Sequence, residues 1–351
     1  MGLNSSVGIN VNFDRQNALY YAGEKITGLI SFQNNYKRLK LRSISLQFIG
    51  EFDYIQPDLY QEYDGLDHSY AEYRSINNRK SFITIRYPIL YRKENENLVV
   101  LHQGQYSWPF EFTLPQLLPP SSSPTTVLHP CIRYYTRIIV DKSWYQQNIT
   151  RVYPLIIFPH VNIFHCDIRR QSTCQSHINR QNFQMKVSLQ QRAILPGQTV
   201  CLDVDLNNPK RLQIERIDTK LIQHRVINTD HHKEILLHID LPGLLNFDQR
   251  QLQQTFHFDI PFDYLSPTFD CKIKGRHSSI SISIYYELKF KAKVHGISDD
   301  IDFSMPIIIG TESSSELHDH YDDIPISYID ALKETELPPD YQSVMTNLLL
   351  E

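Results

Sequence analysis

Residues 280–294 carry the pattern that most limits how this chain can fold. Apolar side chains occupy every even position of this stretch, and mostly Ser, Glu and Lys lie between them. A period of two residues places successive side chains on opposite faces of a β-strand, and no α-helix has this period. The stretch therefore predicts a long strand with one face in a core and the other directed at solvent.

Shorter alternating segments recur along the chain at close spacing. Between Leu41 and Ile44 the apolar positions shift by one residue, which predicts a β-bulge within a strand. Because almost no helical periodicity lies between them, these segments predict an all-β chain of antiparallel sandwiches. Further strands are expected at residues 7–13, 26–32, 39–48, 81–87, 98–101, 106–114, 132–140, 153–158, 200–206 and 305–310.

The two halves of the chain follow the same plan. A glycine-containing turn at residues 20–25 has a counterpart at 191–198, and the strand end at 110–115 has a counterpart at 255–261. A chain of 351 residues is long enough for two domains with separate cores. We therefore expect two tandem β-sandwiches, a polar linker and a flexible C-terminal tail. The predicted boundaries are 1–158, 159–180, 181–311 and 312–351.

Residues 53–80 interrupt the alternation. Tyrosines are interleaved here with aspartates and glutamates, without an apolar stripe. The pattern predicts a long polar loop outside the sheets, and loops of this length in compact domains are usually functional or mobile.

Composition excludes several classes of protein. The formal net charge of −4 argues against a nucleic-acid-binding protein that relies on its overall charge. No run of about 18 apolar residues is present, so no membrane-spanning segment is predicted. The five cysteines form no Cys-x-x-Cys pair, and no secretory signal precedes them. We therefore expect reduced thiols in a cytoplasmic protein.

The common signatures of enzymes are absent from the sequence. It has no Gly-x-Ser-x-Gly elbow, no Gly-rich phosphate loop and no His-Glu-x-x-His motif, so we predict no catalytic residue and no cofactor. The best candidate metal ligands surround the predicted linker, but their spacing matches no common zinc site, and no metal site is predicted. They are His160, His165, Cys166, Cys174 and His177.

A short motif in the tail, Leu337-Pro338-Pro339-Asp340-Tyr341, is typical of a peptide ligand. Two prolines bias the backbone to polyproline II, so the segment loses little entropy when it docks in an aromatic groove. Tyr341 adds a rigid ring with a polar tip that can fill one pocket. WW domains recognise such Pro-Pro-x-Tyr segments. The alternative is that Pro338 and Pro339 only mark a turn or loop in the tail and bind no partner.

Together these features resemble the α-arrestins, the arrestin-domain-containing group. The resemblance implies an arrestin-like pair of immunoglobulin-like β-sandwiches. Two features depart from the family pattern, because only one complete Pro-Pro-x-Tyr motif is present and the loop at residues 119–130 is unusually long and proline-rich. The residues that carry the resemblance are Ala22-Gly23-Glu24, Pro196-Gly197-Gln198, Leu114-Pro115, Ile260-Pro261, Pro306–Thr311 and the tail motif.

The resemblance also implies a non-catalytic trafficking adaptor. The sandwiches would bind a membrane receptor or transporter as cargo, and Pro338, Pro339 and Tyr341 would recruit a HECT-type E3 ubiquitin ligase that contains WW domains. Ubiquitin would then mark the cargo for endocytosis or sorting. The expected location is the cytoplasm, with peripheral association to the plasma membrane or endosomes. The alternatives are a retromer-subunit-like coat scaffold with the same fold, and an unrecognised hydrolase or sugar-binding sandwich.

Three further signals are less specific. Met1–Ser6 fits the pattern for N-myristoylation of Gly2. Tyr321 and Ile324 fit a sorting signal that endocytic adaptors read as an extended strand. Basic residues beside the first-domain strands either bind phosphate groups or simply face solvent and protect strand edges, and strand alternation alone favours the second interpretation. These residues are Lys37, Arg38, Lys40, Arg42, Arg74, Arg79, Lys80 and Arg86.

Overall fold

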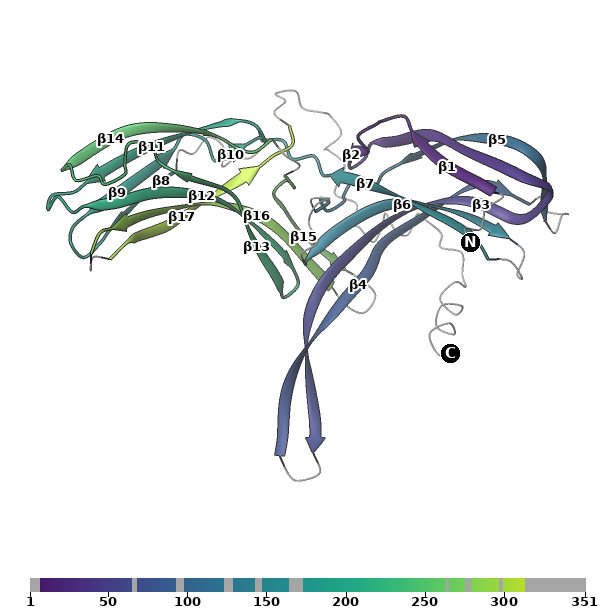
Figure 1. Ribbon diagram of the computed structural model, residues 1–351, viewed down its shortest axis with the longest axis horizontal. Coiled ribbons are helices and arrows are strands. Elements are labelled where there is room, and N and C mark those ends of the chain that lie inside the picture. The colour runs from purple at the N-terminus through teal and green to yellow at the C-terminus, as the bar shows by residue number, and fades with distance from the viewer. Residues whose placement is uncertain are drawn as a thin grey trace, which may run out of the picture.

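A computed structural model describes most of the chain as two β-domains that lie side by side along the long axis of the molecule (Figure 1). All regular elements among the described residues are strands, which confirms the predicted all-β fold. The described residues are 7–64, 68–92, 98–122, 129–142, 147–163, 173–262, 265–274, 279–296 and 299–312, with side chains described except at 7, 57–75 and 274.

The first domain is built around one very long strand, β3, which belongs to both layers of the sandwich. The first part of β3 pairs with β1 and β5, and the part after Leu41 pairs with β4 and β6. β7 then pairs with β6, and β2 adds to β7 as a parallel strand. The strands are β1 (Val7–Phe13), β2 (Leu19–Tyr21), β3 (Lys25–Asp64), β4 (His68–Tyr91), β5 (Val99–Thr113), β6 (Cys131–Lys142) and β7 (Ile149–Phe158).

The predicted bulge lies where β3 passes from one layer to the other. The register between β3 and β6 shifts between Leu41 and Ser43, which confirms the prediction made from the apolar pattern. A bulge bends a strand and increases its twist, so it allows one strand to cross between two sheets. The buried residues before and after the bulge, including Phe32 and Phe48, then face each other in the same core.

The prediction of a long polar loop at residues 53–80 is wrong. β3 and β4 continue together beyond Asp53, where the pairing of β3 with β6 ends, and they form a two-stranded ribbon that projects from the domain (Figure 1). Its register runs from Tyr54 opposite Asn78 to Asp64 opposite His68. A two-stranded ribbon can expose both faces, so it requires no apolar stripe, and tyrosine favours strands.

The second domain is a sandwich of a six-stranded and a four-stranded sheet. The larger sheet has the order β10-β17-β16-β12-β13 with β15 also on β16, and the smaller has the order β14-β11-β9-β8. The strands are β8 (Thr173–Ile178), β9 (Gln184–Leu189), β10 (Ala193–Ile194), β11 (Thr199–Asn207), β12 (Ile214–Ile227), β13 (Asp230–Asp240), β14 (Gln251–Asp259), β15 (Phe269–Lys274), β16 (Ser279–Val294) and β17 (Ile301–Ile309).

β16 has the exposure pattern that its sequence predicts. From Ile282 to Val294 every even position is buried, while the odd positions are exposed or half-buried. β8 was not predicted as a strand. It lies in the stretch predicted as an irregular linker, but it pairs with β9 as an edge strand. An edge strand bonds on one side only, so its mixed polar sequence gives little signal of the pairing.

The internal repeat extends to individual hydrogen bonds. Gly23 N donates to Pro115 O at 3.0 Å, and Gly197 N donates to Ile260 O at the same distance in the second domain. Both glycines have positive φ angles, of 82° and 78°, which favour glycine over other residues. Each turn lies beside a short parallel pairing, β2 with β7 or β10 with β17, so the two sandwiches close in the same way.

The segment between the domains is attached to the end of the second domain. Thr311 N donates to Val161 O at 2.9 Å, and Val161 N donates to Thr311 Oγ1 at 2.8 Å. Ile163 N further donates to Glu312 O at 3.0 Å.

Within the described residues, no helix has the length and apolar character needed to cross a membrane.

Candidate functional site at the domain junction

The tail and N-terminal residues predicted to bind partners all lie outside the described residues. They are Gly2, Tyr321, Ile324, Pro338, Pro339 and Tyr341. The predictions made for them therefore rest on the sequence.

The candidate metal ligands around the linker are not brought together within the described part of the chain. His160 Nδ1 lies 3.4 Å from a carboxylate oxygen of Glu312, whereas the ring of His177 stacks on Phe303. Cys174 is an exposed thiol on β8. His165 and Cys166 lie outside the described residues. No cluster forms from the three that are described.

The basic residues of the first domain fall into an exposed group on β3 and others on β4. Lys37, Arg38, Lys40 and Arg42 are exposed on β3, whereas Arg79 forms an ion pair with Glu51, with 2.6 Å between Nη2 and Oε2. The side chain of Arg74 lies outside the description. A guanidinium that already holds a carboxylate has less capacity for phosphate. Arg79 therefore fits the second interpretation better, in which these basic residues face solvent and protect strand edges.

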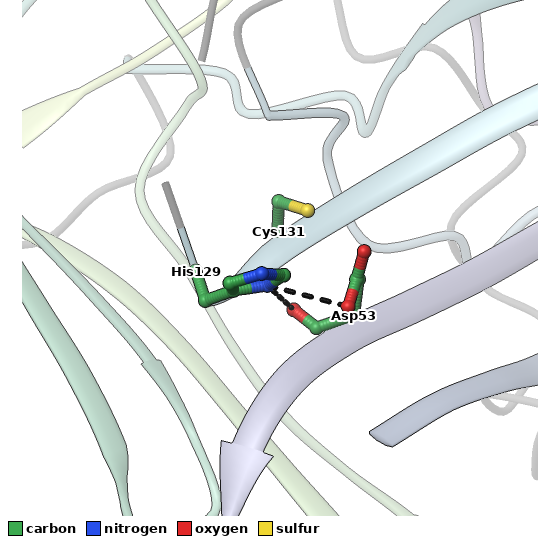
Figure 2. Close-up of side chains that lie close together, drawn as sticks. All are labelled: Asp53, His129 and Cys131. Atoms are coloured by element: carbon green, nitrogen blue, oxygen red, sulfur yellow. Dashed lines mark hydrogen bonds and ion pairs between the residues drawn. The ribbon is translucent and has the colours of Figure 1, made fainter. Parts of the chain in front are cut away.

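The structure instead gathers Asp53, His129 and Cys131 where β3 and β6 meet the second domain. Asp53 and Cys131 are directly opposite each other in the β3–β6 register, and His129 lies two residues before the start of β6. Figure 2 shows the three side chains beside these two strands. His129 Nδ1 lies 3.3 Å from Asp53 Oδ1 and 3.3 Å from Asp53 O. Asp53 is only 8% exposed and Cys131 only 1%.

Two acidic residues of β3 are held by arginine and tyrosine side chains from the strands beside them. Arg133 Nη1 lies 3.2 Å from Asp53 Oδ2, and the Tyr135 hydroxyl donates to Glu51 Oε1 at 2.8 Å. Burial raises the pKa of Glu51, but hydrogen bonds from Tyr135 and Arg79 outweigh burial and leave this pKa below its usual value. The Glu51 carboxylate is therefore stabilised as an anion, in agreement with its ion pair with Arg79.

The second domain contributes a buried cation to the same junction. Arg225 on β12 is 3% exposed, and its Nη1 lies 3.1 Å from Glu234 Oε2 and 3.2 Å from Gln223 Oε1. Its charge is a minor influence that lowers the pKa of the Cys131 thiol of the first domain, which burial raises. Among the described residues, neither Nε nor Nη2 of Arg225 has a hydrogen-bond partner.

Hydrogen bonds connect the two domains across this junction. Ser266 Oγ donates to Ser121 O at 2.7 Å, and Ile55 N donates to Asp230 Oδ2 at 2.7 Å. The buried Tyr286 hydroxyl donates to Ser266 O and accepts from Gln223 Nε2, so the Ser266 backbone is held within its own domain. The junction is therefore bonded through polar groups of both domains.

Comparison with known families assigns both halves of the chain. The model for the N-terminal domain of arrestin (or S-antigen) matches residues 9–163, and the model for the C-terminal domain matches residues 179–314. The two matches follow each other in the order of the two sandwiches. The chain belongs to the arrestin family. No curated protein sequence matches this arrestin-domain chain.

The family gives the junction its chemical context. Arrestin-family proteins are generally non-catalytic and act as trafficking adaptors. At the junction of this arrestin-domain protein, burial raises the pKa of the Cys131 thiol, while Arg133 only partly opposes the rise. A buried thiol with a raised pKa is a poor nucleophile. The arrangement can hold charges and orient the two domains.

Sequence reasoning missed the junction cluster for a physical reason. Asp53 and Cys131 are far apart in the sequence, and only the strand register places them opposite each other. The one local signal is the pair of potential ligands in His129-Pro130-Cys131. A single His-x-Cys pair is too short to indicate a site without the third group.

Proposed function

We propose that this arrestin-domain protein is an α-arrestin that links membrane cargo to a HECT-type E3 ubiquitin ligase. The observation that carries the proposal is a pair of arrestin sandwiches followed by a tail with Pro338, Pro339 and Tyr341. The sandwiches serve as the cargo-binding body, and the tail motif recruits the ligase through its WW domains. Ubiquitin transferred to the cargo then directs its endocytosis or sorting.

The tail motif is suited to weak, reversible recruitment. Its two prolines reduce the entropy lost on docking, and Tyr341 provides the one large side chain that a WW pocket can select. A single motif engages one WW domain at a time. Tight binding to a ligase with several WW domains would therefore require a second copy of the chain in the same assembly.

The remaining partners follow from the same proposal. The cargo is a membrane receptor or transporter, and Tyr321 with Ile324 offers a contact for endocytic adaptors. The protein works in the cytoplasm and associates peripherally with the plasma membrane or endosomes. A myristoyl group on Gly2 would strengthen this association only marginally, because one acyl chain binds membranes reversibly.

The test is to titrate the full-length protein with isolated WW domains from ubiquitin ligases by calorimetry. We expect micromolar binding with one WW domain per chain. Tyr341→Ala should weaken it by more than about 30-fold, because an anchoring aromatic residue contributes about 2 kcal/mol or more. Tyr321→Ala is the matched control, since it removes another tail tyrosine outside the motif, and it should leave the affinity unchanged.

Two results would contradict the ligase-adaptor proposal. One is an absence of binding across the panel, and the other is binding that Tyr341→Ala leaves intact. Either result would indicate that Pro338 and Pro339 only interrupt regular structure and are not a ligand for WW domains. The coat-scaffold alternative, in which arrestin sandwiches assemble without a ligase, would then be the better account.

A further inference from the structure

The geometry at the domain junction points to a metal site, and we propose that Asp53, His129 and Cys131 bind a zinc-class divalent ion. The ligand atoms that these residues offer, a carboxylate oxygen, an imidazole nitrogen and a thiol sulfur, all lie within 4.8 Å of one another. Ligand atoms around a tetrahedral zinc ion are about 3.5 Å apart, so small side-chain movements would complete the site. This proposal departs from the sequence-based expectation of no metal site.

The Asp53 carboxylate supplies independent evidence that a ligand belongs here. Its Oδ2 is held by Arg133 at 3.2 Å, whereas its Oδ1 is buried and accepts no hydrogen bond from the described residues. Oδ1 lies 3.3 Å from His129 Nδ1, but that nitrogen is hydrogen-bonded to the backbone oxygen of Asp53. A buried carboxylate oxygen without a donor is costly, and a bound cation would remove that cost.

The surroundings of the cluster suit a metal ion of this class. Imidazole and thiolate are ligands that zinc prefers, and an ionised Asp53 and Cys131 would together neutralise a divalent charge. Binding releases the Cys131 proton to solvent, because a coordinating thiol is deprotonated. Arg133 would act as an outer partner that fixes the Asp53 carboxylate while leaving Oδ1 for the metal.

Nearby cations are already paired, which limits their repulsion of a metal ion. Arg79 is paired with Glu51, and Arg225 is paired with Glu234. His129 is the accessible ligand, since 24% of its side chain is exposed while Asp53 and Cys131 are buried. Solvent therefore reaches the cluster on the His129 side, where water can take the fourth coordination position.

A second cluster in the chain provides an internal comparison. Asp218, His238 and Asp240 also lie close together, but the group contains no thiol, and His238 and Asp240 are exposed. Cys201 and His257 form a cross-strand pair with 3.2 Å between Sγ and Nδ1, but no third ligand completes that pair within the described residues. Asp218 Oδ1 is also buried without a hydrogen bond from the described residues, so the thiol is what distinguishes the two clusters. In the described part of the chain, the junction cluster alone combines a buried thiol, an imidazole and a buried carboxylate oxygen that accepts no hydrogen bond.

The test uses the full-length protein, freed of metal by a chelator and then titrated with Co²⁺ as a spectroscopic probe and with Zn²⁺. We expect one bound Zn²⁺ per chain by elemental analysis, a thermal stabilisation by Zn²⁺, and a thiolate-to-cobalt charge-transfer band. Cys131→Ser and His129→Gln should each abolish the band and weaken zinc binding by at least about 100-fold. His129→Gln keeps the test informative if the buried Cys131→Ser change impairs folding.

Two controls separate this site from incidental binding. Cys201→Ser removes a thiol that also lies beside a histidine, and His238→Gln removes the imidazole of the second cluster. Both variants should retain the band and the bound zinc. The proposal is overturned if Zn²⁺ and Co²⁺ do not bind, or if the band persists in Cys131→Ser and His129→Gln while a control variant loses it.

Discussion

Glu287 shows how a single residue links the stability of this fold to pH. It lies on β16, where its Oε1 is 3.1 Å from His224 Nε2 and 3.2 Å from Lys233 Nζ. Burial raises the pKa of Glu287, but hydrogen bonds from Ser304, His224 and Lys233 outweigh burial and lower the pKa below its usual value. The folded protein therefore favours the carboxylate more than the unfolded chain does.

The pKa of Glu287 leads to a prediction about acid unfolding. Because the folded pKa is lower than the unfolded value of about 4.3, the stabilisation is complete above that value and is lost as the pH falls through the folded pKa. Urea unfolding measured from about pH 6 to about pH 3 should show that wild type loses more stability than Glu287→Gln.

A matched control tests whether Glu287 itself is responsible. Glu111→Gln removes a carboxylate whose ion pair with Lys25 is largely exposed, and exposed pairs contribute little. This variant should follow the wild-type pH profile. Equal losses in wild type and Glu287→Gln would show that other groups determine the acid sensitivity.

At the scale of elements, the alternation of apolar and polar residues explains what sequence reasoning could and could not find. β16 was predictable because one of its faces lies in a core and the other in solvent. The β3–β4 ribbon was missed because its two-stranded part needs no apolar face. The Asp53–Cys131 cluster depends on which strands pair and in what register, and neither local propensity nor the apolar pattern of one segment determines that.

A glycine of β3 tests how tightly this element packs. A Cβ atom added at Gly50 would lie 2.6 Å from a ring carbon of Phe82, 2.7 Å from Tyr134 Cε1 and 2.8 Å from Ile83 Cγ2. These distances are too short for carbon atoms in contact, so β3 or the side chains around it would have to move. We expect Gly50→Ala to destabilise the protein by about 1–3 kcal/mol in urea unfolding.

The control for this prediction is Gly8→Ala on β1. A Cβ atom added there would have its nearest neighbour, Gln33 Cβ, at 3.8 Å, which is an ordinary contact. Alanine also restricts the unfolded chain more than glycine does, so this variant should be neutral or slightly stabilising. A neutral Gly50→Ala would show that the aromatic rings around β3 can shift without loss of packing.

At the scale of the whole molecule, the domains are joined by a segment that is hydrogen-bonded to the second domain. Val161 N has its acceptor in Thr311 Oγ1, and the Thr311 backbone bonds back to Val161 O. The junction hydrogen bonds from Ser266 to Ser121 and from Ile55 to Asp230 join the domains at separate points. The relative position of the two sandwiches therefore depends on several local bonds, each of which can be removed separately.

Thr311→Val tests the contribution of the linker bond to this arrangement. Valine keeps the shape of threonine but removes the acceptor for Val161 N, and one hydrogen bond contributes about 1 kcal/mol. Hydrogen exchange at the Val161 amide should become about fivefold to tenfold faster if local opening governs exchange. Thr268→Val is the matched control, because Thr268 Oγ1 accepts from Ile309 N at 2.9 Å within the second domain. The control should accelerate exchange at Ile309 and leave Val161 unchanged, whereas equal acceleration of Val161 in both variants would mean that the linker and β17 open as one unit.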